Sequence, residues 1–241
     1  MSINGVLLTE TVFQPFINRV INTVMNKSVN KQMEQLFSRY PSLRCIGENL
    51  HRAYFILEKT FFNSGTLFVC GNGGSASDAE HIVGELMKNF LLKRSMPEEE
   101  KKSFKEVLGS DEEISSRLQM GFRAVCLNGH PALSSAYAND VDPLMTYAQQ
   151  LYVLGKEGDA FIGISTSGNA VNVLNALKVA RVKKISSILL TGENHGICEP
   201  YADCLIKVPL RETYQIQELH LPIYHALCLM IEERFYGKNT E

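Results

Sequence analysis

The sequence predicts an α/β domain built on a parallel sheet. Five short apolar runs, each of a strand's length, alternate with segments of helical periodicity from Thr66 onward. Strands covered by helices on both faces have continuous runs of Val, Ile and Leu, and strand–helix alternation favours parallel pairing. Hydrophobic residues make up 45% of the 241 residues, which is enough to bury a substantial core.

The first sixty residues have helical periodicity. Apolar side chains recur at helical spacing between Val12 and Val24, and Pro41 interrupts the segment that follows. A second helix is predicted from Leu43 to Phe62. Its apolar stripe consists of Ile46, Leu50, Tyr54, Leu57 and Phe61. Packing in the core or between helices explains both stripes, and a subunit interface is the alternative.

The predicted strands come next in the chain. They are TLFVC (66–70), RAVCL (123–127), DAFIGIS (159–165), ISSILL (185–190) and CLIKV (204–208). A long helix from Gln215 to Phe235 is the last element. The charged segment 91–122 interrupts the alternation, and we expect a helical insertion there. We therefore predict one domain over 1–241, with N-terminal helices in 1–62.

Composition excludes several classes of protein. The net charge is −2 with both signs interspersed, unlike the basic surface of a nucleic-acid binder. The first residues contain no secretory signal, and no apolar run is long enough to span a membrane. We expect a cytoplasmic protein whose six cysteines, none in a CxxC pair, are free thiols. A disulfide or all-cysteine metal framework is the alternative.

The first motif is CGNGGSASDAEH (70–81), which follows a predicted strand and opens a helix. Its glycines permit tight curvature and close approach of a ligand. Its serine hydroxyls and the start of the helix suit an anion. The glycine spacing differs from the dinucleotide-binding pattern, and no Lys-Ser/Thr pair of a Walker loop follows. An ordinary tight turn is the alternative interpretation.

The second motif is ISTSGNAVNVL (164–174), again between a strand and a helix. Ser165, Thr166 and Ser167 provide three consecutive hydroxyls, and the Gly-Asn pair that follows favours a turn. Hydroxyls and backbone N–H groups can surround a phosphate without a lysine. One such loop could be a helix cap with surplus serines. Two at strand ends of one sheet predict a binding site, because ligands of open α/β sheets bind at the carboxyl ends of strands.

Two further pairs could carry chemistry. His81 and Glu85 share a helix face at i, i+4 and could hold a metal or transfer protons; a solvated surface pair is the alternative. Gln217 and His225 share a face of the last helix, but eight residues span about 12 Å. Both could reach one metal only if Gln217 lies in an irregular first turn, which Pro222 would favour.

These motifs together resemble the sugar isomerase (SIS) family and, within it, the phosphoheptose isomerases. The resemblance rests on CGNGGSASDAEH, the His81/Glu85 pair, NDVDP (139–143), ISTSGN (164–169) and the Gln217/His225 pair, and covers most of the chain. It implies a doubly wound five-stranded parallel sheet with N-terminal helices. It also implies a homotetramer with sites shared between subunits.

The resemblance implies a role for each matching residue. The substrate-binding residues would be Asn72, Gly73, Gly74, Ser75, Asn139, Asp140, Ser165, Thr166, Ser167 and Gln217. A Zn²⁺ ion would be held by His81, Glu85, Gln217 and His225. Glu85 and His225 would be the catalytic acid/base pair. The implied reaction converts sedoheptulose 7-phosphate to D-glycero-D-manno-heptose 7-phosphate through an enediol, for heptose and surface-glycan synthesis.

The chain departs from the family pattern at three positions. Ala170 replaces a common serine, Asn89 an arginine and Tyr214 an aspartate. Two other functions are compatible with the same fold. One is a non-catalytic SIS module that binds a protein partner, and the other is an isomerase of another sugar phosphate. Retention of the implied metal and acid/base residues favours an enzyme over a binding module.

Overall fold

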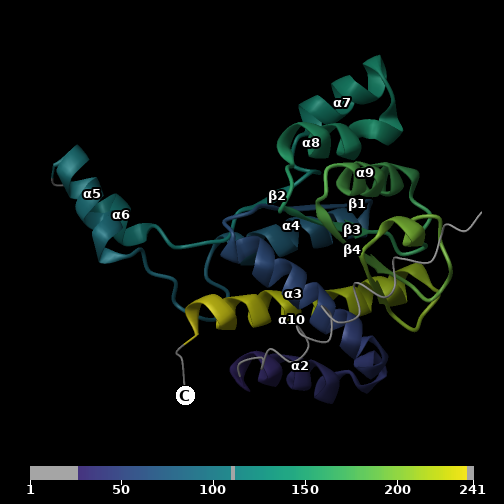
Figure 1. Ribbon diagram of the computed structural model, residues 1–241, viewed down its shortest axis with the longest axis horizontal. Helices are drawn as coiled ribbons and strands as arrows, with labels where there is room; N and C mark the ends of the chain where they lie inside the picture. The colour runs from purple at the N-terminus through teal and green to yellow at the C-terminus, as the bar shows by residue number, and fades with distance from the viewer. Residues whose placement is uncertain (1–26, 110–111, 238–241) are drawn as a thin grey trace, which may run out of the picture.

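The computed structural model describes residues 27–109 and 112–237 (Figure 1). The predicted helix between Val12 and Val24 lies outside the described residues. The element at the centre is a sheet whose strands are β1 (Leu67–Gly71), β2 (Ala124–Cys126), β3 (Ala160–Ile164), β4 (Ser186–Thr191) and β5 (Cys204–Lys207). All pairings are parallel and the order is β2-β1-β3-β4-β5. The five predicted strands and their parallel arrangement are confirmed.

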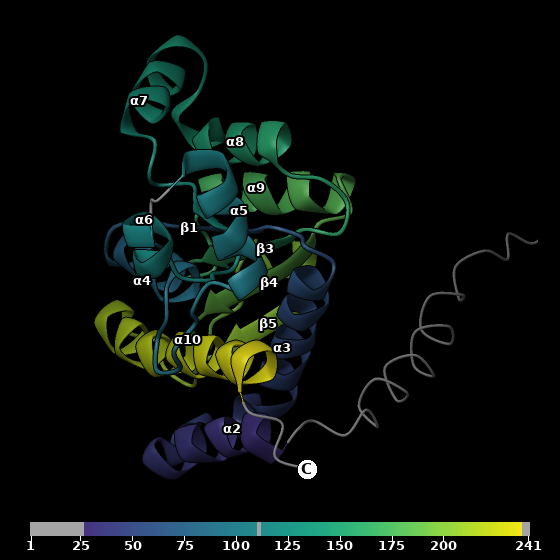
Figure 2. The same ribbon diagram turned by 90° about the vertical axis from the view of Figure 1, so that its left-hand side faces the viewer.

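Helices cover both faces of this sheet (Figures 1 and 2). Side chains alternate along each strand, so Val69 and Ile162 belong to one core cluster while Phe68 and Phe161 belong to another. The first cluster lies under α3 (Gly47–Phe62), α4 (Gly74–Met87) and α10 (Thr213–Tyr236); the second lies under α8 (Thr146–Leu154) and α9 (Val171–Val182). The predicted doubly wound fold is therefore confirmed.

The chain changes direction across the sheet between β1 and β3. From β1 it passes through α4 to β2 on one side, whereas from β3 it passes through α9 to β4 on the other side. β1 and β3 are nevertheless neighbours, with Gly71 paired to Ile164 at their carboxyl ends. A switch point of this kind leaves a crevice beyond the strand ends, which is where open α/β sheets bind ligands.

The N-terminal helices differ in detail from the prediction. A helix α2 (Lys27–Arg39) precedes a 3₁₀ helix, η1 (Pro41–Ile46), and α3 then begins at Gly47. The single helix predicted from Leu43 is therefore wrong over its first turn. Three residues per turn place Leu43 and Ile46 on one side of η1, where both are buried. The apolar stripe of α3 is buried in the core, so packing within the chain explains it.

The middle of the segment 91–122 projects from one edge of the molecule (Figure 1). It contains α5 (Glu98–Leu108) and α6 (Glu112–Arg117), and α5 buries none of its residues. The segment returns to the body beside an antiparallel bridge between Ser95 and Gln119. The remaining elements are α7 (Pro131–Asp140) and the 3₁₀ helices η2 (Pro143–Met145) and η3 (Glu199–Tyr201). The division into one domain with an insertion stays a prediction.

Two further sequence expectations concern the whole chain. All six cysteines are free thiols, and Cys70, Cys198, Cys204 and Cys228 are buried. Among the helices of the described ranges, none combines the length and apolar character needed to cross a membrane.

Candidate active site

The two glycine- and hydroxyl-rich loops lie side by side at the switch point. The first follows β1 and the second follows β3, which are adjacent in the sheet. A direct bond links the two regions, because the side-chain amides of Asn72 and Asn172 donate to each other's oxygens, both at 2.9 Å. Tyr147 also donates to the Asn72 side chain at 3.1 Å and to the Gly71 carbonyl at 2.7 Å. The amide of Asn72 is thus held beside the carboxyl ends of β1 and β3.

The first loop turns sharply and receives a side chain from α10. Gly73 has a φ of 56°, a left-handed conformation that favours glycine. A Cβ atom on Gly74 would lie 2.6 Å from Nε2 of Gln217, so glycine is needed for this close contact. Ser75 is buried, and its N–H donates to the Asn72 carbonyl. Asn72, Gly73, Gly74, Ser75 and Gln217 are therefore brought together, as the resemblance implied for a sugar site.

The second loop keeps its hydroxyl protons available. Ser165 is buried, and its oxygen accepts the N–H of Ala170 at 3.3 Å. The oxygen of Ser167 accepts the N–H of Asn169 at 3.2 Å. A hydroxyl that accepts a hydrogen bond can still donate one. Thr166 lies between these serines, and its carbonyl accepts the N–H of Gly192. The loop can therefore offer O–H donors to an anion such as a phosphate.

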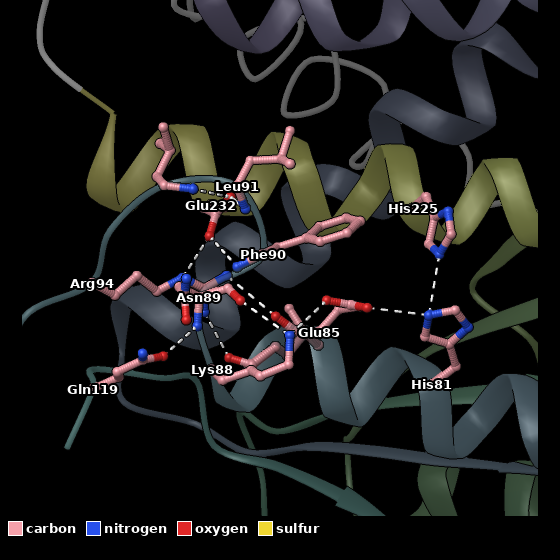
Figure 3. A network of polar contacts seen from close by, with 12 residues as sticks. His81, Glu85, Lys88, Asn89, Phe90, Leu91, Arg94, Gln119, His225 and Glu232 are labelled. Atoms are coloured by element: carbon pink, nitrogen blue, oxygen red, sulfur yellow. Dashed lines mark hydrogen bonds and ion pairs between the residues drawn. The ribbon is translucent and has the colours of Figure 1, made fainter. Parts of the chain in front are cut away.

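A second polar cluster lies further along α4, where that helix faces α10 (Figure 3). His81 is its middle member. Its Nε2 atom lies 3.1 Å from Oε1 of Glu85 and 3.4 Å from Nε2 of His225. The ring of Phe90 packs against that of His225, with centroids 5.4 Å apart. The predicted i, i+4 pair therefore forms, and His225 joins it from 144 residues away.

The other ring nitrogen of His81 is held by Tyr224. The Tyr224 hydroxyl lies 3.0 Å from Nδ1 of His81 and 3.2 Å from Oδ1 of Asp78. A carboxylate only accepts, so the hydroxyl donates to Asp78 and accepts the Nδ1–H of His81. Nε2 of His81 then carries a lone pair, and it faces the oxygen of Glu85 and Nε2 of His225. A proton or a cation between these atoms is needed to reconcile them.

Burial changes the acid–base properties of this cluster. The pKa of His225 is lowered, chiefly by burial and then by the neighbouring His81. Its imidazole is therefore neutral at neutral pH and able to accept a proton. Burial raises the pKa of Asp78, against the opposing effects of the Tyr224 hydrogen bond and of His81. These shifts follow from removing charge from water.

The helix α10 runs alongside α4 in the same direction. Gln217 meets Gly74, and about two turns further along both helices His225 meets His81. The helix begins at Thr213 and continues through Pro222 to Tyr236. The irregular first turn that would have brought Gln217 to the metal is therefore not observed. Within one chain, Gln217 belongs to the first loop and His225 to the cluster.

The structure does not gather every residue that the resemblance implied. Asn139 and Asp140 hydrogen-bond to each other at the end of α7, which lies beyond α8, away from α4 and α10 (Figure 1). Within residues 27–109 and 112–237, no three His, Cys, Asp or Glu side chains form a group arranged to hold a metal ion. His81, Glu85 and His225 form a chain of pairwise contacts instead.

Several residues of these clusters were not singled out from the sequence. Asp78 and Asn172 lie inside the two loop motifs, and Tyr224 precedes His225, so the sequence around each of them could have pointed to it. Asn172 needed the pairing of β1 with β3 to reveal its partner. Tyr147 comes from α8 with no local pattern to mark it. Its contact with the first loop depends on the packing of a distant segment.

The doubly wound sheet and the two loops at its switch point define an α/β protein of the SIS type. Among models of protein families, none matches the chain. The phosphoheptose isomerase of Helicobacter pylori is 35% identical over 198 residues, covering 82% of this chain and 90% of that protein. The enzyme of the same name from Aneurinibacillus thermoaerophilus is 31% identical over 220 residues, covering 91% and 96%.

Solved structures agree with these relatives. The phosphoheptose isomerase of Neisseria gonorrhoeae superposes with a TM-score of 0.65 at 27% identity, covering 85% of this chain and 97% of that one. A phosphoheptose isomerase from Francisella tularensis gives a TM-score of 0.67 at 26% identity, covering 85% and 96%. The chain belongs to the phosphoheptose isomerase family, within the SIS proteins.

Proposed function

We propose that this protein is an aldose–ketose isomerase that converts sedoheptulose 7-phosphate to D-glycero-D-manno-heptose 7-phosphate. Its place in the phosphoheptose isomerase family supports this substrate. The product would serve heptose synthesis for a surface glycan. The observation that carries the proposal is the contact of His81 with both Glu85 and His225, which joins a carboxylate and a neutral imidazole beside the sheet.

The reaction moves a proton between adjacent carbons through an enediol. Glu85 is the base that takes the proton from carbon, and His225 transfers protons between the two oxygens. The lowered pKa of His225 suits this role, because a neutral imidazole can accept one proton and return it. Ser165, Thr166 and Ser167 hold the phosphate, while Asn72 and Gln217 contact the sugar. Asn139 and Asp140 are assigned to the sugar on the resemblance alone.

A zinc-like ion fits the donor chemistry of the cluster. His81, Glu85 and His225 supply two imidazoles and a carboxylate, a set that zinc commonly takes. A cation between the facing lone pairs of these groups would stabilise them, as a proton also would. When bound, the ion would polarise the substrate carbonyl and stabilise negative charge on the enediol oxygens. Gln217, the fourth implied ligand, would have to come from another subunit, because in this chain it lies against Gly74.

The separation along α4 supports sites shared between subunits. From Gly74 to Glu85 the helix rises about 16 Å, more than the length of an extended seven-carbon sugar phosphate. A substrate held by one chain's first loop is therefore hard to reconcile with reacting carbons at the same chain's Glu85. Loops of one subunit facing Glu85 of another would shorten this distance. We infer a homotetramer, which light scattering at micromolar concentration can test. We also infer a cytoplasmic location.

A substrate panel tests the proposed reaction. Purified protein is incubated with five-, six- and seven-carbon ketose phosphates, with and without chelator, and the products are followed by NMR. Turnover should be fastest with sedoheptulose 7-phosphate and should fall on chelation. Faster turnover of a shorter sugar would identify a different sugar-phosphate isomerase. Binding without turnover of any member would favour a non-catalytic SIS module.

A further inference from the structure

A buried ion pair lies at the end of α4, beside the proposed acid/base residues (Figure 3). Nε of Arg94 donates to Oε1 of Glu232 at 2.8 Å, and the two side chains are 0% and 1% exposed. Arg94 is also enclosed by the rings of Phe122 and Tyr236, each 5.1 Å from its guanidinium carbon. Burying two charges is costly. Such a pair is stable only where further hydrogen bonds satisfy both charged groups.

The guanidinium group of Arg94 holds the last turn of α4. Its Nη1 atom donates to the Leu86 carbonyl at 2.8 Å, and Nη2 donates to the Glu85 carbonyl at 3.3 Å. Carbonyls at a helix C-terminus lack partners within the helix, and a cation there also suits the helix dipole. Arg94 thus fixes the backbone of the residue proposed as the carbon base.

The carboxylate of Glu232 holds the chain that follows α4. It accepts the backbone N–H groups of Phe90, Leu91 and Leu92 at 2.8, 2.8 and 3.0 Å. Burial opposes ionisation of Glu232, but these N–H groups and the Arg94 charge outweigh it and lower its pKa. Phe90, held in this way, packs against the ring of His225.

The same helix carries both Glu232 and His225. They are seven residues apart on α10, about two turns, so both face α4. The ion pair therefore joins α4 and α10 at one point, and the acid/base residues meet His81 two turns away. We propose that Arg94 and Glu232 form a positioning pair that sets Glu85 and Phe90 relative to His225. This inference rests on the proposed function.

Two conservative variants test the pair while keeping a side chain of similar size at each position. Arg94→Lys keeps the positive charge but loses the fork that binds two carbonyls, and Glu232→Gln keeps the shape but loses an acceptor. Displacement of a catalytic group by about 1 Å can cost about 100-fold in rate. We expect kcat to fall about 10- to 100-fold in each variant, with KM changed less than about threefold because the phosphate loops are untouched.

Matched controls separate this effect from general damage. Arg117→Lys alters an exposed pair with Glu113, and Glu233→Gln alters the next position on α10. Both should retain wild-type kcat. NMR of ¹⁵N-histidine-labelled protein provides a second readout, because the His225 ring lies against Phe90. Its resonances should shift in the Arg94 and Glu232 variants and stay in place in the controls.

The outcomes distinguish this inference from the proposed reaction. If wild type is active and both test variants match it in kcat and in the His225 resonances, the positioning role is overturned. A kcat loss that vanishes once rates are scaled to the folded fraction also overturns it. If wild type isomerises no ketose phosphate, the proposed function fails. The His225 resonances then decide alone whether the pair sets the imidazole's surroundings.

Discussion

The two ends of α4 use opposite kinds of chemistry. At its start, Asn72 and the facing Asn172 bind through neutral amides in an exposed loop. Near its end, charged groups are fixed in the interior, where Glu232 takes four donors and Arg94 is enclosed by aromatic rings. Neutral donors suit a group that binds and leaves in each turnover. A buried, fully paired network suits groups whose geometry must persist between turnovers.

Under the proposed function, the start of α4 captures the ligand and its end carries out the bond chemistry. We therefore predict that substitutions at the start of α4 and at the neighbouring second loop act on KM. Substitutions towards the end of α4 should act on kcat. The following experiments measure KM and kcat separately, so they can contradict this assignment of roles to the two ends of α4.

The largest effect is expected for Glu85→Gln. The variant keeps the shape of the side chain and removes the base, so kcat should fall at least about 100-fold, the usual scale of a lost general base. Steady-state kinetics with sedoheptulose 7-phosphate measure it. Glu80→Gln, on an exposed position of the same helix, is the matched control and should stay active. Wild-type turnover in Glu85→Gln would remove Glu85 from the mechanism.

Metal content gives the next test of the α4–α10 cluster. Protein purified without added metal should carry about one zinc-like ion per chain, and His81→Ala/His225→Ala should carry nearly none, since two nitrogen ligands are lost. Elemental analysis measures both. The control is His195→Ala, because His195 and Glu199 form the same i, i+4 pair on an exposed surface. Equal metal in wild type and the double variant would leave the cluster with acid/base roles only.

The sequence predicted the local features of both regions of α4 well, and the contacts between distant segments poorly. Strands, both loops and the His81–Glu85 pair follow from apolar runs and from helical spacing, which are local. The grouping of Gln217 with His225 at one metal stays a prediction: α10 is helical through Pro222, so within one chain Gln217 lies at Gly74 and His225 at His81. Arg94 and Glu232 are separated by 138 residues, and no periodicity links them. Only the packing of α10 beside α4 reveals that pair.

A smaller effect is expected at the second loop. Thr166→Val deletes a hydroxyl at nearly constant volume, and a hydrogen bond to a charged group contributes about 1.5–3 kcal/mol. KM for the sugar phosphate should therefore rise about tenfold or more, and inhibition by inorganic phosphate should weaken in parallel, with kcat little changed. Steady-state and inhibition kinetics measure this. Unchanged KM together with unchanged phosphate inhibition would show that the loop binds something else.

The smallest effect concerns His220, which lies on α10 between the two regions. It is 0% exposed, its Nδ1 atom has no hydrogen-bond partner among the described residues, and its Nε2 atom lies 3.5 Å from the Thr191 carbonyl. Burial lowers the pKa of His220 to about 4 in the folded protein, from an ordinary value of 6.5. The neutral form is favoured on folding, so this group costs no stability above about pH 6.5 and destabilises the fold as pH falls towards 4. At pH 5.5 the loss should be about 1.4 kcal/mol, one pH unit below the unfolded pKa.

His220→Leu should remove that part of the acid sensitivity. The Thr191 carbonyl keeps its bond from the Val208 N–H, so the variant leaves no unpaired acceptor there. Urea denaturation at pH 7.5 and 5.5 measures the free energy of unfolding. We expect the difference between the two pH values to be about 1.4 kcal/mol smaller in His220→Leu than in wild type. Equal acid sensitivity in wild type and His220→Leu would mean that the histidine takes up its proton within the fold without cost.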